Sequence, residues 1–315
     1  MAQVAVLGDA CVDMTIRLPD RAAGRLDLTQ STPQLYGGGT AANTAVALAR
    51  LGQAVTMISA VGDDGYGRWI IKDLQAEDID TRGVHLVHDS FTPMVMALIE
   101  PDGERLIVVW PPEGGAQNEI LKEHINPDLI AGKTWLHTTG MCLRVSPSRE
   151  AVLSGMAQAR AAGLTVSIDL NMRLELWDLS PQTKATFMQA VEMADVVFGN
   201  AEEEIIPLSG ERSLELAARQ LCGGQRIIVA RMGKQGAWIV SPGEQVQSAA
   251  YKVQVVDTLG AGDAFNSGFI GARLAGHDVE EAGRWGNAAA ALKLTRAGAR
   301  GAPTRAELDK FLTNG

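Results

Sequence analysis

The most informative stretch of the chain reads Lys252-Val253-Gln254-Val255-Val256, then Asp257-Thr258-Leu259-Gly260-Ala261-Gly262-Asp263, then Ala264–Phe269. We expect a strand, a tight glycine turn and a helix. Gly260, Ala261 and Gly262 have little or no side chain, so backbone amides there can approach a ligand closely. Backbone amides at a helix N-terminus favour the binding of an anion. The turn therefore predicts an anion hole suited to a phosphoryl group. Asp263 is the candidate base, although helix capping is the alternative interpretation.

Short apolar runs alternate with helical patterns along the chain. Expected strands are Val4–Leu7, Val55–Ala60, Trp135–Thr138, Thr165–Ile168, Val196–Phe198, Ile227–Ala230, Ala237–Val240 and Lys252–Val256. Expected helices are Ala42–Leu51, Gly65–Ala76, Ser148–Ala162, Gln182–Met193, Ser213–Leu221, Ala264–Ala275, Glu280–Thr295 and Arg305–Leu312. This order predicts an α/β fold with a mostly parallel sheet and helices on both faces.

Two regions, about 14–36 and 84–112, interrupt this alternation with strand-like runs and no helix. Within the second, Val95–Glu100, Pro101-Asp102-Gly103-Glu104 and Arg105–Val109 predict a hairpin. We expect the two regions to form one small antiparallel sheet that serves as a lid. Because no repeat or linker is evident, the lid is an excursion from a single domain spanning 1–315.

Composition indicates a soluble globular protein: 315 residues, 46% of them hydrophobic and 21% charged. A net charge of −9 argues against non-specific binding to nucleic acid or to an anionic membrane. The N-terminus predicts a strand rather than a signal peptide. Cys11, Cys142 and Cys222 are widely spaced, so we expect neither a disulfide framework nor a zinc site, and a cytoplasmic location.

Polar residues after two further strands are candidates for the nucleotide end of a site. Asn200-Ala201-Glu202-Glu203 could hold a hydrated Mg²⁺, or could simply begin a helix. Lys234, in the glycine turn Arg231–Gly236, could meet nucleotide phosphates, or could belong to a plain hairpin turn.

An acceptor end is predicted near the N-terminus. The glycines of Tyr36-Gly37-Gly38-Gly39 let backbone amides face a small polyol, and Asn43 offers a donor and an acceptor. Asp13 could accept hydrogen bonds from sugar hydroxyls, or could be a turn residue. Arg173, which follows the strand Thr165–Ile168, could steady a sugar acid or the transferring phosphate; a salt bridge to Asp169 is the alternative.

Together and in this order, these segments resemble the ribokinase-like carbohydrate kinases, the PfkB family. The resemblance rests on Gly38-Gly39-Thr40-Ala41-Ala42-Asn43-Thr44-Ala45 with Gly52 and Gly62, on Asp257–Asp263 with Ser267-Gly268, and on Asn200 to Glu203. It extends from about Val4 to Pro303. Two ordered signatures at opposite ends are far more specific than one glycine turn.

The resemblance implies a ribokinase-like three-layer α/β/α sandwich with a small β-sheet lid, and transfer of the ATP γ-phosphoryl to a sugar hydroxyl. The roles it implies cover Asp263 as base; Gly260, Ala261 and Gly262 as the anion hole; Asp13, Gly38, Gly39 and Asn43 at the sugar; Lys234, Gly236 and Asn287 near ATP; and Asn200 and Glu203 on Mg²⁺ through water. Asp257, with backbone carbonyls near Thr258 and the Ala299-Arg300-Gly301 turn, could bind K⁺, as in several members of the family.

The run Asp169–Arg173, followed by Leu176-Trp177, resembles fructokinase-like and 2-keto-3-deoxygluconate-kinase-like members, so a ketose or a keto sugar acid is the expected acceptor. A nucleoside kinase is the alternative, with Trp110 and Tyr36 available for stacking. A non-catalytic sugar or nucleotide sensor is a third, weakened because Asp263 and the glycines are retained. We expect a homodimer formed through the lid, as in some relatives.

Overall fold

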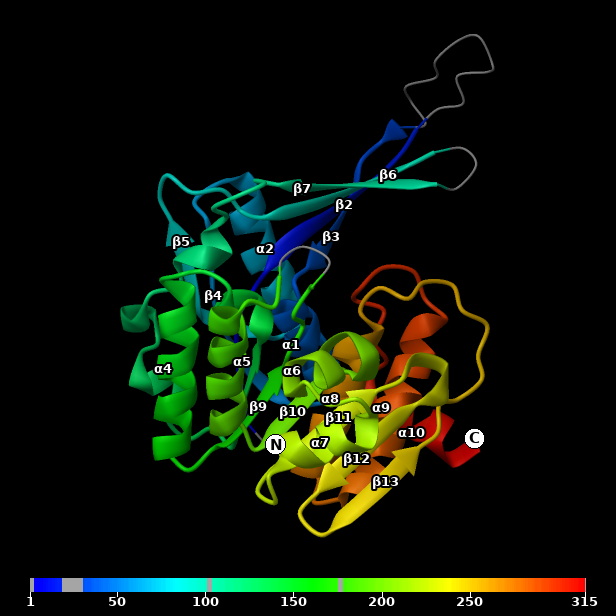
Figure 1. Ribbon diagram of the computed structural model, residues 1–315. Coiled ribbons are helices and arrows are strands. Elements are labelled where there is room, and N and C mark those ends of the chain that lie inside the picture. The colour runs from blue at the N-terminus through cyan, green and yellow to red at the C-terminus, as the bar shows by residue number, and fades with distance from the viewer. Residues whose placement is uncertain (1–2, 19–30, 101–103, 175–177, 315) are drawn as a thin grey trace.

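The computed structural model describes residues 3–18, 31–100, 104–174 and 178–314 (Figure 1). Its larger sheet has the strand order β13-β12-β11-β10-β9-β8-β1-β4-β5. The strands are β1 (Gln3–Leu7), β4 (Ala54–Gly62), β5 (Asp80–Val87), β8 (Trp135–Thr139), β9 (Thr165–Asp169), β10 (Val196–Asn200), β11 (Ile227–Arg231), β12 (Ala237–Ser241) and β13 (Glu244–Ser248). Neighbours from β5 to β11 pair in parallel, whereas β12 and β13 add an antiparallel end. The mostly parallel sheet is therefore confirmed.

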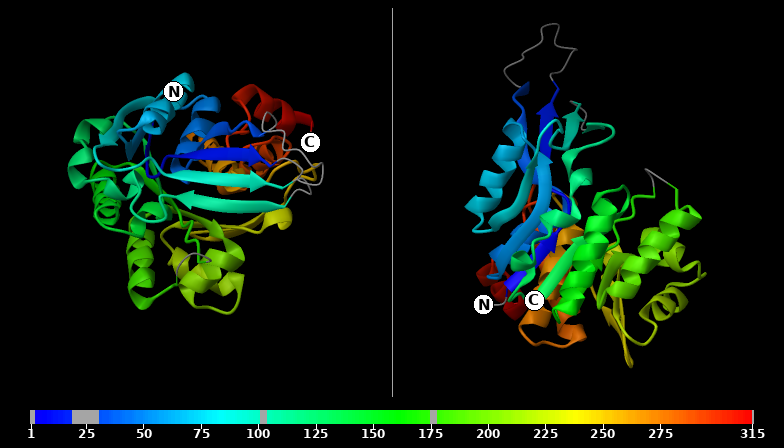
Figure 2. Two further views of the ribbon diagram at one scale, coloured as in Figure 1. Left: turned by 90° about the horizontal axis from the view of Figure 1, so that it is seen from above. Right: turned by 90° about the vertical axis from the view of Figure 1, so that its left-hand side faces the viewer.

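The helices cover both faces of this sheet, as the predicted three-layer sandwich requires (Figures 1 and 2). One face carries α4 (Ser148–Ala161), α5 (Pro181–Met193) and α7 (Leu214–Cys222), and the short α3 (Pro127–Ile130) and α6 (Ile206–Ser209) lie on that side. The other carries α1 (Thr40–Arg50), α2 (Gly65–Ala76), α8 (Ala261–Leu274), α9 (Val279–Leu294) and α10 (Arg305–Asn314). Strand β1 shows why both faces need helices, because its alternating side chains are apolar on each side. Ala5 and Leu7 pack in the core beneath α4 and α5, and Val4 and Val6 pack in the core beneath α1 and α8.

A second sheet of four strands projects from the carboxyl ends of the parallel strands (Figure 2). Its order is β3 (Gln34–Gly38), β2 (Cys11–Arg17), β6 (Met94–Ile99) and β7 (Arg105–Trp110). It differs from the predicted lid in two respects. Strands β2 and β6 pair in parallel, so the sheet is mixed, and Val84 lies in β5 of the large sheet. Within the predicted lid regions, 19–30 and the turn at Pro101–Gly103 lie outside the described residues.

The predicted strand Lys252–Val256 is wrong. The segment pairs with no strand; instead the amides of Val256 and Asp257 donate to the carbonyl of Leu294, at 2.8 and 3.3 Å. The strand before α8 is β13, paired with β12 across the turn at Gly243. Alternating valines signal an extended backbone, but a strand also needs a partner, and the end of α9 lies there instead.

No helix among the described residues combines the length and apolar character needed to cross a membrane.

Candidate active site

The residues predicted to form an anion hole lie at the N-terminus of α8. Gly260 precedes the helix with φ of 78°, and a β-carbon there would collide with the carbonyl of Ala299, so only glycine fits. The amide of Ala261 donates back to Thr258, at 3.2 Å. Within the described part of the chain, no side chain caps this helix. The amides of Gly262 and Asp263 therefore lie in the first turn, where intrahelical acceptors are lacking and the helix dipole favours an anion.

Asp263 is a buried carboxyl, 9% exposed, in that first turn. Burial raises its pKa to about 7, even though Asn43 stabilises the carboxylate by donating from Nδ2 to Oδ2 at 2.9 Å. This value suits a general base, which works best with a pKa near the operating pH. The contact joins α1 and α8, so it brings the two predicted ends of the site together.

A buried ion network, which the sequence analysis did not identify, holds α8 in place. Arg231, at the end of β11, donates from both terminal nitrogens to the carboxylate of Asp169, at 2.9 and 2.7 Å. It also donates to Asn266 Oδ1 at 2.8 Å, and Asn266 donates to Asp169 at 2.7 Å. Burial alone would raise the pKa of Asp169, but Arg231 and Asn266 hold it below its usual value. The signal in the sequence was a charged residue at the end of each of two buried strands.

Glu204, rather than Glu203, is the buried carboxylate after β10. Its oxygens accept from the amides of Met172, at 2.7 Å, and Asn200, at 2.6 Å. Burial and the nearby Asp169 raise the pKa of Glu204. Glu203 is exposed, and Asn200 Oδ1 accepts from its amide at 3.1 Å, which is the capping geometry considered as the alternative. Among the described residues no three acidic, histidine or cysteine side chains gather as a metal cluster.

At the acceptor end, Asp13 lies on β2 against Gly38 of β3. A β-carbon on Gly38 would lie 2.5 Å from Asp13 Oδ1, so the glycine is needed to admit this carboxyl group. Burial raises the pKa of Asp13 to about 6, and Cys11 Sγ donates to it at 3.7 Å. A partly desolvated carboxyl group on the lid can accept hydrogen bonds from a polyol.

Gly39 forms the turn between β3 and α1. Its φ is 93°, and a β-carbon would lie 2.7 Å from the carbonyl of Asp9. Asp9 was not a predicted site residue, yet it organises this turn: its carboxylate accepts from the amides of Thr40 and Ala41, at 2.8 and 3.2 Å. The turn thus fixes the start of α1 and, with it, Asn43.

Arg173 is exposed, with φ of 50°, in the segment after β9. Its predicted alternative, a salt bridge to Asp169, does not fit, since Arg231 takes up that carboxylate with both terminal nitrogens. Asn171, also with positive φ, donates to Thr40 Oγ1 at 2.7 Å and ties this segment to α1. Non-glycine residues in this conformation cluster at ligand sites. Leu176 and Trp177 lie outside the described residues.

Gly236 and Asn287, predicted near the nucleotide, meet at one residue, Ser248. Asn287 Nδ2 donates to the Ser248 carbonyl at 3.1 Å and to its hydroxyl at 2.9 Å. Gly236 has φ of 90°, and a β-carbon there would collide with the same carbonyl. Both therefore have structural roles in joining α9 to the β12–β13 hairpin. Lys234 is exposed in the short turn Gly233–Gln235.

Asp257, the predicted potassium ligand, has several hydrogen-bond partners. Its carboxylate accepts from the amides of Leu259, at 3.0 Å, and Gly298, at 2.9 Å. Its carbonyl accepts from Lys293 Nζ at 2.8 Å. An ammonium group thus lies beside the predicted potassium ligand.

The residues described bring together a helix N-terminus, a buried carboxyl group and a polar residue of the small sheet. This arrangement is compatible with phosphoryl transfer. Residues 1–305 match the pfkB family carbohydrate kinases, and the chain belongs to this family. It is 32% identical to a fructokinase of Vibrio alginolyticus over 99% of both chains, and 32% identical to an ATP-dependent ribose-1-phosphate kinase of Halopiger xanaduensis, also over 99% of both. A 5-dehydro-2-deoxygluconokinase of Shouchella clausii is 29% identical, over 97% of this chain and 94% of its own.

Solved structures agree with this assignment. A provisionally named ribokinase II from E. coli, in complex with ATP and Mg²⁺, has a TM-score of 0.87 at 26% identity, with both chains fully covered. A fructokinase double mutant from Vibrio cholerae O395, bound to fructose, ADP and potassium, has a TM-score of 0.82 at 30% identity, over 99% and 98% of the chains. The ribokinase-like fold is confirmed, and the chain is an ATP-dependent sugar kinase rather than a non-catalytic sensor.

Proposed function

We propose that this sugar kinase phosphorylates a ketose or a keto sugar acid, with Asp263 as the base. The acceptor hydroxyl gives its proton to Asp263 while its oxygen forms a bond to the γ-phosphorus of ATP. The bond from that phosphorus to the bridging β,γ-oxygen breaks, and ADP leaves. The amides at Gly260, Ala261 and Gly262 stabilise the charge on the transferring phosphoryl group.

The observation that carries this proposal is the Asn43–Asp263 pair. Asn43 Nδ2 donates to the base at 2.9 Å, whereas its Oδ1 is buried and, within the described residues, has no donor. A buried acceptor without a partner destabilises a protein by about 1–3 kcal/mol, so such groups mark places where a ligand binds. A sugar hydroxyl would supply the missing donor and lie within reach of Asp263.

Mg²⁺ is part of the proposal. Asn200 and Glu203 at the end of β10 would hold it through water, since Mg²⁺ keeps several waters and needs few protein ligands. The exposed Glu203 carboxylate is compatible with such indirect binding. Bound there, the ion would neutralise phosphate charge. Lys234, Gly236 and Asn287 would lie near the nucleotide, and the cytoplasmic location predicted from the scattered cysteines belongs to the same proposal.

The substrate class rests on Arg173 and on the relatives. Its exposed guanidinium side chain follows the carboxyl end of β9, where open parallel sheets bind ligands. A fructokinase and a 5-dehydro-2-deoxygluconokinase are among the similar proteins, and their named acceptors are a ketose and a keto sugar acid.

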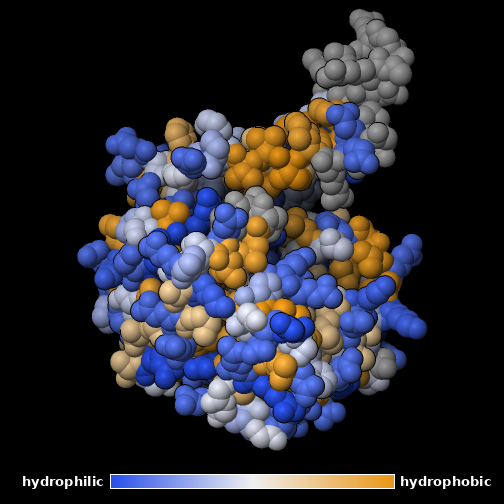
Figure 3. All heavy atoms as spheres, in the orientation of Figure 1, coloured by the Kyte–Doolittle hydropathy of each residue, from blue (hydrophilic) through white to orange (hydrophobic). Residues whose placement is uncertain are grey.

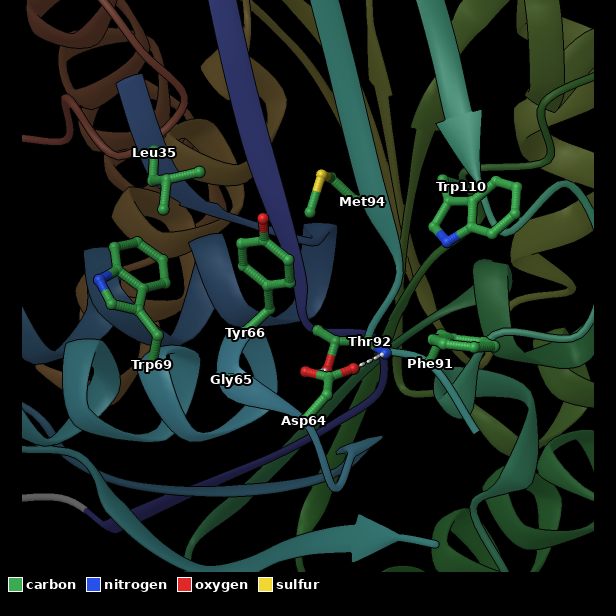
Figure 4. Close-up of a pocket in the computed structure, with 9 residues that line it drawn as sticks. All are labelled: Leu35, Asp64, Gly65, Tyr66, Trp69, Phe91, Thr92, Met94 and Trp110. Carbon is green, nitrogen blue, oxygen red and sulfur yellow. Dashed lines mark hydrogen bonds between the residues drawn. The ribbon is translucent and has the colours of Figure 1, made fainter. Parts of the chain in front are cut away.

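A riboside acceptor is the alternative, and the lid bears on it. Trp110 pairs with Met94, which pairs with Val12, so it lies on the face of the lid opposite to Asp13. There it lines a pocket of about 480 Å³ facing α2 (Figure 4). Tyr36 pairs directly with Asp13 and shares its face. Of the two predicted stacking residues, only Tyr36 shares a face of the sheet with Asp13, the proposed sugar ligand.

An ATP-consumption screen over ketoses, aldoses, keto-deoxy sugar acids and nucleosides tests the proposal. We expect the highest kcat/KM for a ketose or keto sugar acid. Arg173→Ala should lower kcat/KM for sugar acids about tenfold more than for neutral ketoses, because it removes a charge-assisted contact. Arg212→Ala, which changes an exposed arginine between α6 and α7, is the control. The proposed substrate class would be contradicted if a nucleoside were the best substrate, or if Arg173→Ala lowered kcat/KM equally for sugar acids and ketoses.

The four-stranded sheet is proposed as the lid of a single kinase domain that dimerises through it. Five consecutive residues of β7 are exposed apolar side chains (Figure 3): Leu106, Ile107, Val108, Val109 and Trp110. Alternating side chains place them on both faces of an end strand, and such surfaces attract a partner. Sedimentation analysis should show a dimer that Val108→Glu shifts to monomer, whereas Leu216→Glu on α7, also exposed, should not. A wild-type monomer would refute this.

A further inference from the structure

Lys293 is a fully buried lysine, 0% exposed, near the C-terminal end of α9. Lysines are almost never fully buried unless they are paired, since burial of an ammonium group is unfavourable. Its Nζ donates to the carbonyl of Asp257 at 2.8 Å and contacts that of Arg296 at 3.4 Å. Burial lowers its pKa, opposed by the charges of Asp257 and Asp263. This ammonium is therefore held by two carbonyl oxygens, as a bound cation would be, and the charges of two carboxyl groups favour it.

The two carbonyls belong to loops on either side of the anion hole. Asp257 begins the turn that leads to Gly260, and Arg296 begins the loop that contains Ala299. The loops also meet directly, because the Gly298 amide donates to the Asp257 carboxylate at 2.9 Å and Gly260 packs against the Ala299 carbonyl. The Lys293 ammonium thus links both loops directly behind the phosphate-binding amides.

We propose that the Lys293 ammonium is a built-in monovalent cation that takes the place of K⁺ beside the anion hole. Two features support this. The position bridges carbonyl oxygens of two loops, which is the ligand type that alkali cations use, and the charge is carried by a covalently attached group that cannot dissociate. The kinetic test of this proposal rests on the proposed kinase function. The binding test does not depend on that function.

The kinetic experiment compares KCl with choline chloride at constant ionic strength. Wild-type turnover should differ by less than about twofold between the salts. Lys293→Ala removes the charge and leaves space, so turnover should fall at least about tenfold in choline and recover mostly in KCl. Lys293→Met removes the charge but fills the space, so it should be impaired in both salts. Lys310→Met, an exposed lysine on α10, is the matched control and should behave like wild type.

The binding experiment needs neither sugar nor ATP. The unfolding temperature of Lys293→Ala should rise with KCl but not with choline chloride, because an ion that binds only the native state stabilises it, whereas wild type should respond equally to both salts. This readout remains informative even if the substrate assignment fails.

A wild-type enzyme that needs K⁺, or a Lys293→Ala protein whose rate and unfolding temperature ignore K⁺, would overturn the proposal. If Lys293→Ala folds only in KCl, the proposal is supported. If Lys293→Ala folds in neither salt, the turnover of the wild-type protein decides. A turnover that rises more than about twofold on adding K⁺ overturns the proposal, and an unchanged turnover supports it.

Discussion

The two ends of the proposed site are built in different ways. At the phosphate end, the start of α8 is held by a buried network in which Arg231 bridges Asp169 and Asn266. At the lid, a four-stranded sheet exposes apolar side chains, and β7 is uncovered on both faces. Under the proposed function, the residues for phosphoryl transfer are fixed inside the core, whereas the residues for the acceptor lie on a thin sheet. The comparison teaches that the two proposed roles, chemistry and substrate choice, are supported by separate structures.

Two buried carboxyl groups make the contrast concrete. Burial raises the pKa of both, to about 7 for Asp263 and about 6 for Asp13. Asp263 is held by Asn43 between two core helices, and Asp13 lies on β2 beside a glycine of β3. Changing Asp263 should therefore affect turnover, and changing Asp13 should affect the binding of the sugar.

The largest effect is expected for Asp263→Asn. Loss of the base and its charge should lower kcat by about 10³-fold or more, while sugar binding measured by calorimetry stays close to wild type. Because the folded-state pKa lies above its unfolded value, the carboxylate opposes folding increasingly as pH rises from about 4 to 7. Above pH 7 the variant should therefore have a higher free energy of unfolding than the wild-type protein. Asp309→Asn, an exposed surface change, is the control, and near-normal turnover would refute the role.

Arg231→Met should produce the next largest effect. It leaves Asp169 and Glu204 buried without their cation, so unfolding free energy should fall by about 3–5 kcal/mol and turnover should fall with it. Urea denaturation measures the change. Adding Asp169→Asn should recover part of the loss. Arg219→Met, which removes an exposed ion pair on α7, should have little effect. A stable, active Arg231→Met would show that the phosphate end does not depend on this network.

Asp13→Asn should change binding more than turnover. A hydrogen bond to a charged acceptor contributes about 1.5–3 kcal/mol, so KM for the sugar should rise by about ten- to one hundred-fold while kcat falls less. Steady-state kinetics with the best acceptor measure both. A fall in kcat as large as that of Asp263→Asn would erase the distinction between the two ends.

The last prediction concerns pH, which tests both carboxyl groups without any substitution. Below about pH 7, kcat/KM should fall about tenfold per unit as Asp263 becomes protonated, and more steeply below pH 6, where Asp13 follows. The profile should be measured with a neutral sugar, which does not titrate. Asp13→Asn should remove only the lower inflection. A flat profile between pH 5 and 8 would contradict both assignments.

The sequence revealed those parts of the site that depend on local backbone geometry. Gly260, Gly38 and Gly39 are recognisable because a side chain would collide at each position, and such constraints remain visible as glycine. Buried parallel strands were equally predictable, since a run of β-branched residues covered on both faces looks the same in any protein.

Features that depend on distant partners were not predictable. The Lys252–Val256 segment has a strand-like pattern but meets α9 instead of a strand. Arg231 and Asp169 are 62 residues apart, and only the folded sheet brings them together. Lys293 looks like any lysine near a helix end, and its burial becomes evident only when the loops around Asp257 and Arg296 close over it.

The link between Asn43 and Asp263 also bears on how the protein would respond to small changes of pH, because this hydrogen bond opposes the effect of burial on the pKa of Asp263. With a pKa of about 7, Asp263 is divided between its protonated and ionised forms near neutral pH, so a small change of pH alters the ionised fraction appreciably. If Asp263 is the base, mild acidification alone would slow the consumption of ATP.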